Sequence, residues 1–280
     1  MPLAPDARHA LIQAVRDAAK AEIIPRFRRL DDRDVQTKSG ALDLVTEADT
    51  CAEAAIRKSI ATILPGARVV GEEGVATDPA ELDQIGLPGV TVVVDPVDGT
   101  WNFARGLALF GTILAVIEDG ETVFGLLYDP LADAWIEAAK GEGSWYVVGE
   151  NRTRLTLGAP PPLAEMTGLH SAYGLTPSQW AASAALQPRF GRVTSLRASL
   201  WDYRLQITGG AGFCLNRYLN VWDHAAGVLA LTEAGGYAAL LDGRPYDPAL
   251  REGYLLTAQS KSLWDQIAPD FAAALGARSK

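Results

Sequence analysis

Apolar residues recur at helical spacing in two stretches of the first 64 residues. In the first stretch, residues 4–29, the apolar positions are Leu11, Ile12, Val15, Ala18, Ala19 and Ile23. This spacing predicts an amphipathic helix. A second helix is expected from Thr46, a residue type that caps helix N-termini, to about residue 64, with Asp49 at the position of a capping acid. The polar segment 31–42 between them predicts a loop or an irregular hairpin.

Short apolar runs bounded by turn residues follow, and they predict a largely antiparallel sheet. The expected strands are residues 68–70, 91–95, 110–117, 122–128, 133–138 and 143–147. The clearest hairpin lies across residues 118–121, because Asp119-Gly120 supplies a turn between two apolar runs. Residues 78–89 are expected to form a surface loop.

Strand-like and helix-like patterns alternate after the segment 149–165, which contains the prolines 160–162. The expected strands are 166–170, 192–196, 212–218, 236–241 and 254–257, and the expected helices are 177–186, 199–208, 223–234 and 260–275. Such alternation is typical of a layered α/β arrangement. We therefore predict an α/β (α+β) protein with an N-terminal half, residues 1–150, and a C-terminal α/β half, residues 151–280, that meet at this segment.

The composition is that of an ordinary globular protein, with 48% hydrophobic and 21% charged residues among 280. The net charge of −9 argues against non-specific binding to nucleic acid or to an anionic membrane. No apolar stretch approaches the roughly 20 residues that span a bilayer, and the N-terminus lacks the apolar core of a signal peptide, so we expect a cytoplasmic protein. Cys51 and Cys214 are far apart in sequence and are expected to be reduced.

The most informative segment is residues 95–103, Asp-Pro-Val-Asp-Gly-Thr-Trp-Asn-Phe, directly after a predicted buried strand. The proline fixes the backbone between Asp95 and Asp98, so both carboxylates and the Val97 carbonyl can converge on a hard cation, which prefers oxygen ligands. An acidic protein that binds a phosphate ester also needs bound cations to attract it. The sequence therefore predicts a metal site at the end of this strand.

Other residues extend the predicted site. Gly99 and Thr100 can turn the chain so that backbone N–H groups face a phosphate. Glu72 and Glu73 end another short strand, and Asp223 stands at the start of a predicted helix. Three acidic clusters therefore lie at the ends of predicted elements.

Together these segments resemble the inositol monophosphatase family of magnesium-dependent, lithium-sensitive phosphatases. The family signature is Asp-Pro-(Ile/Val)-Asp-Gly-Thr-x-Asn-Phe, with Gly-Glu-Glu upstream and Trp-Asp-x-Ala-(Ala/Gly) downstream. All three motifs occur here in this order, and the resemblance extends from Lys38 to about Gly236. It implies a layered α-β-α-β-α fold like that of the sugar phosphatases, with about two or three Mg²⁺ ions per active site. It also implies a small phosphorylated metabolite as substrate and a homodimer.

The resemblance implies roles for individual residues. Glu72 and Asp95, with the Val97 carbonyl oxygen, would bind the first, catalytic Mg²⁺. Asp95, Asp98 and Asp223 would bind the second, and Asp98 and Asp223 would also face the substrate. Two cations in such a site generate the attacking water and stabilise the leaving oxygen of a phosphate monoester.

The family likeness also implies how water and phosphate are positioned. Thr100, hydrogen-bonded to Asp49, would help to orient the attacking water, which Glu72 also contacts. The backbone amides of Gly99 and Thr100 would hold phosphate oxygens. Asp49 has a simpler interpretation as an ordinary acid in the first turn of its helix, and the two interpretations are compatible.

Two further residues have both a functional and a simpler interpretation. Lys38 matches a family position in a loop near the metals, although a loop lysine is usually only solvated. Glu73 is either a solvated neighbour of Glu72 or a metal ligand through a water or at a third site.

The substrate-facing residues differ from the inositol-hydrolysing pattern. Segment 196–203 replaces a small-residue stretch, and Asn216 stands where those enzymes carry a glutamate that binds inositol hydroxyls. Arg197 and Arg217 could instead recognise a carboxylate or a second phosphate, with Arg204 as a further candidate cation. Inositol monophosphate is the leading substrate, and histidinol phosphate, 3′-phosphoadenosine 5′-phosphate and fructose 1,6-bisphosphate are alternatives. A non-catalytic regulator that binds metal and phosphate is the alternative of another class.

Overall fold

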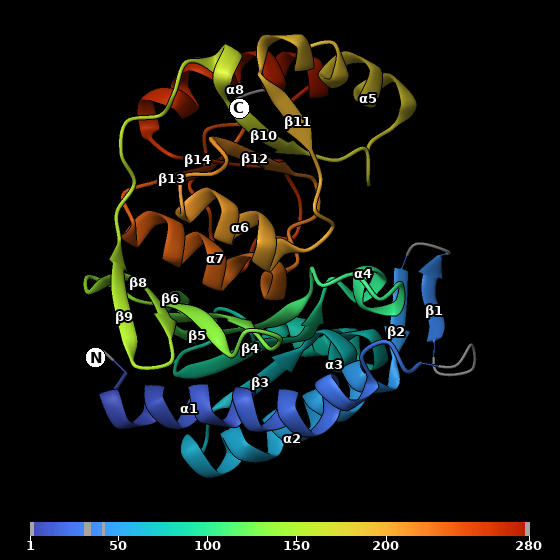
Figure 1. Ribbon diagram of the computed structural model, residues 1–280, viewed down its shortest axis with the longest axis vertical. Coiled ribbons are helices and arrows are strands. Elements are labelled where there is room, and N and C mark those ends of the chain that lie inside the picture. Colours follow the sequence, from blue (N-terminus) through green and yellow to red (C-terminus); the bar gives the residue numbers. More distant parts are fainter. Residues whose placement is uncertain (1–2, 31–34, 41–42, 278–280) are drawn as a thin grey trace.

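The helices and sheets of the protein stack in alternating layers (Figure 1). The computed structural model describes residues 3–30, 35–40 and 43–277. The α-helices are α1 (Pro5–Ala18), α2 (Glu47–Ile63), α3 (Glu72–Thr77), α4 (Thr100–Ala104), α5 (Pro177–Ala184), α6 (Ser199–Ile207), α7 (Val221–Glu233) and α8 (Lys261–Leu275). Helices α1 and α2 cover one face of a seven-stranded sheet, α6 and α7 separate it from a five-stranded sheet, and α5 and α8 cover the far face of the second sheet. The predicted layered α/β fold is confirmed.

The first sheet forms the base of the site. Its strands are β3 (Arg68–Gly71), β4 (Val90–Asp98), β5 (Gly111–Glu118), β6 (Glu121–Asp129), β7 (Ala134–Ala139), β8 (Gly143–Val148) and β9 (Asn151–Leu155), in this order across the sheet. Strands β3 and β4 are parallel, and the other neighbouring pairs are antiparallel. The carboxyl ends of β3 and β4 therefore meet at the same edge. There the pairing of β4 with β5 becomes irregular between Asp95 and Asp98, which changes the direction of the side chains.

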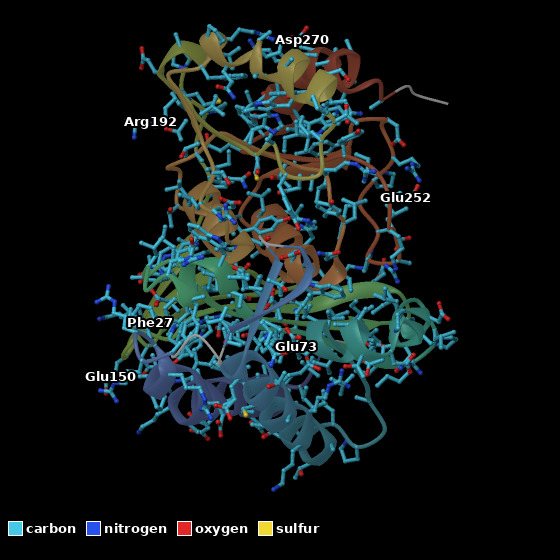
Figure 2. The ribbon with its side chains drawn as sticks, turned by 90° about the vertical axis from the view of Figure 1, so that its right-hand side faces the viewer. Phe27, Glu73, Glu150, Arg192, Glu252 and Asp270 are labelled. Carbon is cyan, nitrogen blue, oxygen red and sulfur yellow. The ribbon has the colours of Figure 1, made fainter. Side chains whose placement is uncertain are left out.

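The second sheet belongs to the C-terminal part of the chain. Its strands are β10 (Thr167–His170), β11 (Arg192–Thr194), β12 (Phe213–Asn216), β13 (Tyr237–Leu240) and β14 (Leu255–Ala258), in the order β11-β10-β12-β14-β13. A separate hairpin of β1 (Val35–Gly40) and β2 (Asp43–Thr46) lies beside Glu73 (Figure 2).

Helix α7 is buried on nearly all sides because it lies between the two sheets. Its backbone lies against Gly125 of β6, where an added Cβ would be 2.8 Å from the Cα of Ala226. This close contact requires glycine at position 125. It also fixes the first turn of α7, which carries Asp223, relative to the first sheet.

In the N-terminal part of the chain, the types of the predicted elements are correct, but their first and last residues differ from those in the structure. The first predicted helix is α1, which continues into a π-helical turn at Ala19–Ile23. The irregular hairpin is confirmed as β1 and β2, with a register shift between Thr37 and Gly40. Residues 31–34 and 41–42 of the predicted loop lie outside the described residues.

The helices in the described ranges are too short or too polar to cross a membrane. Both cysteines are free thiols, as expected.

One strand and several short helices were not predicted. Strand β9 lies in the segment that we took as the junction of the two halves, and it extends the first sheet. It has no apolar run, because Arg152 and Arg154 occupy exposed positions that suit an edge strand. Helices α3 and α4, and a 3₁₀ helix at Pro79–Gln84, are too short for a periodic pattern to reveal them. The position of the boundary between the halves stays a prediction.

Candidate active site

Acidic side chains from separate elements gather where β3 and β4 end. Glu72 begins α3 directly after β3, Asp95 and Asp98 lie in β4, and Asp223 lies in the first turn of α7. Carboxylate oxygens of Asp95, Asp98 and Asp223 lie within 4.8 Å of one another. Glu72 interacts electrostatically with both Asp95 and Asp223. The structure thus brings together the four carboxylates that the family likeness assigns to metal binding.

These acids repel one another in a buried setting. Asp95 and Asp98 are only 2% and 4% exposed. Burial, followed by repulsion from Glu72 and Asp98, holds the pKa of Asp95 well above its ordinary value. Burial and the nearby Asp223 do the same to the pKa of Asp98. At neutral pH such a cluster binds protons or cations, because either one relieves the repulsion.

Hydrogen bonds from the start of α6 hold two of the acids in place. The backbone N–H groups of Ser199 and Leu200 donate to the two carboxylate oxygens of Asp98 over 2.9 and 2.7 Å. The hydroxyl of Ser199 and the amide of Asn220 donate to the two oxygens of Asp223, each over 3.0 Å. Sequence reasoning missed Ser199 and Asn220. Their only signal is that Ser199 opens a predicted helix and that Asn220 is a capping residue type just before Asp223.

Asp95 provides the test of whether a metal fits. Its Oδ1 is buried and has no hydrogen-bond partner among the described residues. A buried carboxylate oxygen without a partner is unfavourable unless a ligand satisfies it. The cluster contains only carboxylates, and such a donor set suits a hard cation such as Mg²⁺. The Val97 carbonyl oxygen lies 3.0 Å from the Thr100 Oγ1 and keeps a lone pair for a ligand.

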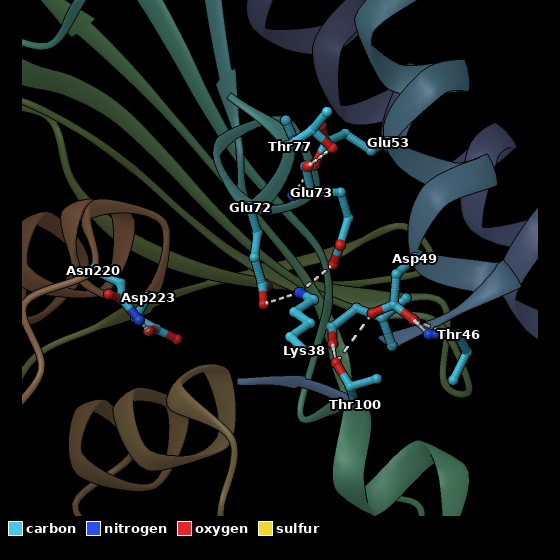
Figure 3. Close-up of polar contacts among 12 residues, drawn as sticks. Lys38, Thr46, Asp49, Glu53, Glu72, Glu73, Thr77, Thr100, Asn220 and Asp223 are labelled. Atoms are coloured by element: carbon cyan, nitrogen blue, oxygen red, sulfur yellow. Dashed lines mark hydrogen bonds and ion pairs between the residues drawn. The ribbon is translucent and has the colours of Figure 1, made fainter. Parts of the chain in front are cut away.

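Lys38 of β1 extends into the site from outside the main sheets. Its Nζ lies 2.7 Å from Oε1 of Glu72 and 2.6 Å from Oε1 of Glu73, so it lies between the two glutamates (Figure 3). Burial raises the pKa of Glu72 to about 8 although Lys38 opposes the shift, and burial raises the pKa of Glu73 to about 7. Burial lowers the pKa of Lys38, but the two glutamates outweigh it and the pKa lies above its ordinary value. Lys38 and Glu73 therefore form a paired group with Glu72 and are not simply solvated.

Asp49 makes both of the expected contacts at once (Figure 3). Its Oδ2 accepts hydrogen bonds from the backbone N–H and the hydroxyl of Thr46 over 2.8 and 2.5 Å, which is the capping arrangement at the start of α2. Its Oδ1 lies 3.0 Å from the Thr100 hydroxyl. The cap fixes the carboxylate, and the carboxylate in turn fixes the orientation of Thr100.

Glu53 of α2 is a supporting residue that sequence reasoning missed. Its carboxylate accepts the backbone N–H groups of Glu73 and Gly74, each over 2.9 Å, and it pairs with Arg57 over 2.9 Å. It thereby holds the first turn of α3, whose first residue is Glu72. The sequence contained no signal for this role, since a glutamate on a helix is normally exposed.

Gly99 allows the chain to turn between Asp98 and Thr100. Its φ of 82° lies in the left-handed region. A Cβ at this position would lie 2.7 Å from the carbonyl oxygen of Leu109 and 2.9 Å from the Cβ of Ala198. Only glycine fits this turn, which faces the acidic cluster.

The site opens into a cleft of about 1160 Å³ that both halves of the chain line. Among the residues predicted to contact substrate, those that line the cleft are Asp98, Gly99, Thr100, Arg197, Asn216, Arg217 and Asp223. The proposal of Arg204 as a further cation was wrong. Its guanidinium bonds to Asp129 and Tyr146 over 2.8 and 3.0 Å, and it is not among the residues that line the cleft.

Known proteins with similar sequences and structures include several phosphatases. The chain is 31% identical to an inositol-1-monophosphatase of Bacillus subtilis over 217 residues, which cover 76% of this chain and 78% of the relative. It is 32% identical to a histidinol-phosphatase of Streptomyces coelicolor, with 84% and 87% covered. The fold matches that of the Thermotoga maritima IMPase TM1415 with a TM-score of 0.79 at 23% identity, over 95% of this chain and 96% of the other.

Fold, acidic cluster and relatives together define a phosphatase, which is a phosphoric monoester hydrolase. A family model described as the inositol monophosphatase family matches residues 6–275. The chain belongs to that family, whose members are metal-dependent.

Proposed function

We propose that the protein is a Mg²⁺-dependent phosphomonoesterase that hydrolyses the phosphate ester of a small alcohol by attack of water on phosphorus. The observation that carries this proposal is the buried cluster of Asp95, Asp98 and Asp223. It includes an unpartnered carboxylate oxygen of Asp95 and lies beside the Gly99 turn in an open cleft. The proposal is consistent with family membership and with the phosphatases among the relatives.

The residues that would hold the cations follow from the donor set. Glu72, Asp95 and the Val97 carbonyl would hold one Mg²⁺, and Asp95, Asp98 and Asp223 would hold a second. When bound, these cations would neutralise charge on the phosphoryl oxygens and lower the pKa of the attacking water. Such help is needed because phosphate monoesters hydrolyse up to about 10²¹-fold more slowly without an enzyme.

The chain's own groups would orient the water. If the Thr100 hydroxyl donates its proton to Asp49, 3.0 Å away, its lone pairs are free to accept a proton of the water. Glu72 would accept a second hydrogen bond and take up the proton that leaves the water as it attacks. Asp49 contributes by fixing the direction in which Thr100 donates, since its other oxygen is held by Thr46.

The turn at Gly99 would hold the phosphate. The backbone N–H groups at the start of a helix have no intrahelical partner, and those of Gly99 and Thr100 would donate to phosphate oxygens. Because no side chain projects from Gly99, the phosphate can approach the backbone closely. Asp98 and Asp223 would contribute through the cations they would hold.

Three candidate substrates come from the names of relatives: inositol monophosphate, histidinol phosphate and fructose 1,6-bisphosphate. Inositol monophosphate is the first to assay, and 3′-phosphoadenosine 5′-phosphate is a fourth candidate. We also propose that the protein is cytoplasmic and binds neither nucleic acid nor membranes, as its charge and apolar pattern lead us to expect, and that it forms a homodimer, as the family resemblance implies.

The test is phosphate release from a panel of esters with Mg²⁺ or with a chelator, beside the Asp95→Asn protein. The panel contains both inositol 1-phosphate enantiomers, histidinol phosphate, 3′-phosphoadenosine 5′-phosphate, fructose 1,6-bisphosphate and glycerol phosphate. Turnover should require Mg²⁺ and fall at least ~100-fold in Asp95→Asn, because even residues that only orient metal ligands contribute about 10–100-fold. Turnover that survives both chelation and this substitution would show that the cluster is not the catalytic centre.

A further inference from the structure

The cleft is also lined by positive charge. The cleft is lined by five acidic side chains, Glu72, Asp95, Asp98, Asp202 and Asp223. Asp202 is repelled by Asp223 and so belongs to the acidic side. The remaining charged lining residues, apart from the paired Lys38, are Arg197 and Arg217.

Arg197 is held next to the phosphate turn. The side-chain amide of Asn102 donates to the Leu196 carbonyl over 2.8 Å, which keeps this segment against the residues that follow Gly99. The guanidinium carbon of Arg197 lies 4.0 Å from the ring centroid of Trp101. The backbone of Arg197 has a φ of 58°, a conformation that is uncommon for a residue other than glycine. Strained residues of this kind cluster at functional sites.

Arg217 approaches the cleft from the second sheet. It follows β12 directly and precedes Asp223 by six residues. Its guanidinium lies 5.2 Å from the ring centroid of Tyr254, and its Nη1 donates to the Gly253 carbonyl over 3.4 Å. The neighbouring Asn216 adds an uncharged amide to the lining of the cleft.

Neither arginine has a carboxylate partner within ion-pair distance among the described residues. Arg204 differs in this respect, because it is neutralised by Asp129 and lies outside the cleft. A guanidinium that lines a cleft and has no carboxylate partner of its own can bind a carboxylate or phosphate of a ligand through two parallel hydrogen bonds.

We propose that the preferred substrate is a phosphate monoester whose alcohol carries a second anionic group, a carboxylate or another phosphate, and that Arg197 and Arg217 bind this group. The inference rests on the proposed function, since it assigns the leaving-alcohol side of the same site. A neutral polyol such as inositol offers these arginines no charge. Histidinol phosphate would place a cationic amine beside two guanidinium groups.

Matched substrates test the proposal. Glycerol 3-phosphate and 3-phosphoglycerate differ only in a hydroxymethyl or carboxylate group, and fructose 6-phosphate and fructose 1,6-bisphosphate differ by a second phosphate. We expect kcat/KM to be at least ~10-fold higher for the anionic member of one pair, because hydrogen bonds to charged groups are stronger than those between neutral groups. The substrate pair with the larger ratio of kcat/KM, anionic over neutral member, tells whether the second group is a carboxylate or a phosphate.

Variants identify the residues responsible. Arg197→Gln and Arg217→Gln should each lower kcat/KM for the anionic substrate about 10-fold, mainly through KM, and change the neutral one less than about 3-fold. Arg192→Gln is the matched control, since Arg192 is exposed and is not among the residues that line the cleft. Thermal unfolding of each variant checks that the fold is retained.

The outcomes separate this inference from the proposed function. Mg²⁺-dependent turnover with equal or higher kcat/KM for the neutral esters, unchanged in both variants, overturns the inference alone. If no ester is hydrolysed, the proposed function fails. Calorimetric binding of 3-phosphoglycerate and glycerol 3-phosphate to the Glu72→Gln protein then decides the inference: tighter binding of the carboxylate ester that is lost in Arg197→Gln or Arg217→Gln supports it, and equal binding overturns it.

Discussion

Glu72 and Glu73 are neighbours in the chain and both contact Lys38, yet only Glu72 also interacts electrostatically with Asp223. Burial holds the pKa of Glu72 at about 8 and that of Glu73 at about 7, above the ordinary value of 4.5 for both. A carboxyl group whose pKa is higher in the folded state stabilises the fold while it is protonated. This stabilisation is fully present below the unfolded pKa and is lost as the pH rises through the folded value.

The metal-free protein should therefore lose stability progressively from about pH 4.5, the ordinary pKa of both glutamates, to about pH 8, the pKa of Glu72 in the folded state. Thermal unfolding in the presence of a chelator should show a melting temperature that falls across this range. Mg²⁺ should flatten the dependence, because it binds the ionised cluster of the folded state. Glu72→Gln should also reduce the slope. Equal slopes with chelator, with Mg²⁺ and in Glu72→Gln would show that the cluster does not govern stability.

Thr100 allows the proposed water-orienting role to be separated from a packing role. Thr100→Val keeps the shape of the side chain and removes the hydroxyl that lies 3.0 Å from Asp49. We expect kcat to fall by about 10²-fold with little change in KM, the size typical of a lost proton-transfer arrangement. Thr100→Ser keeps the hydroxyl and should stay within about 5-fold of the wild type on the same scale. Steady-state kinetics that give Thr100→Val a normal kcat would exclude the role.

The residue scale also shows what a sequence can reveal about such a site. Asp95 and Asp98 were predicted because they share one short motif. Ser199 and Glu53 were not, because each acts on a partner far away in sequence, Ser199 on Asp98 and Glu53 on the backbone of Glu73. Partners of this kind depend on how separate elements pack, which the local pattern does not contain.

At the scale of elements, the start of α3 depends on its support from α2. The carboxylate of Glu53 is 5% exposed and accepts two backbone N–H groups in the first turn of α3. Without it these donors lose their partner and Arg57 loses one of its two carboxylates. Glu72 begins the same turn, so support for α3 is also support for a proposed metal ligand.

Glu53→Ala should lower the free energy of unfolding by about 1–3 kcal/mol, the usual effect of leaving buried donors unsatisfied. It should also weaken Mg²⁺ activation, because the turn that carries Glu72 is no longer fixed. Urea unfolding and a Mg²⁺ titration of activity measure the two effects. Glu150→Ala, at an exposed position (Figure 2), is the control and should stay within about 0.5 kcal/mol. A Glu53→Ala protein with normal stability and normal Mg²⁺ activation would contradict the supporting role.

Helices and strands were easier to predict from the sequence when their pattern of apolar and polar residues was longer. Helix α2, with its cap at Thr46, and the hairpin at Asp119-Gly120 follow from local rules that the structure confirms. Strand β9 and helix α3 do not, since β9 is defined by pairing with β8 and α3 is a single short turn after Gly71. Of these two, α3 carries Glu72, so one element of the site was among the hardest to predict.

At the scale of the whole molecule, α7 joins the two sheets and completes the acidic cluster. The helix packs against β6 on one side, while its first turn presents Asp223 to Asp95 and Asp98 of β4. The distance between these carboxylates therefore depends on how closely the helix lies on the first sheet. Gly125 sets that distance, because its missing side chain lets the backbone of Ala226 approach.

Gly125→Ala should therefore affect the site from the far side of α7. The added Cβ would meet the backbone of Ala226 at 2.8 Å, so the helix has to shift outward, and overpacking of this kind costs about 1–3 kcal/mol of stability. Because Asp223 moves with the helix, the Mg²⁺ concentration for half-maximal activity should rise and kcat should fall. Thermal unfolding and Mg²⁺ titrations of activity measure both effects. Gly158→Ala is the matched control, since a Cβ there meets no atom within 4 Å and it should change neither quantity. A Gly125→Ala protein that loses stability but keeps normal Mg²⁺ dependence would show that the cluster tolerates a displaced helix, and that the position of Asp223 is set by Ser199 and Asn220 instead.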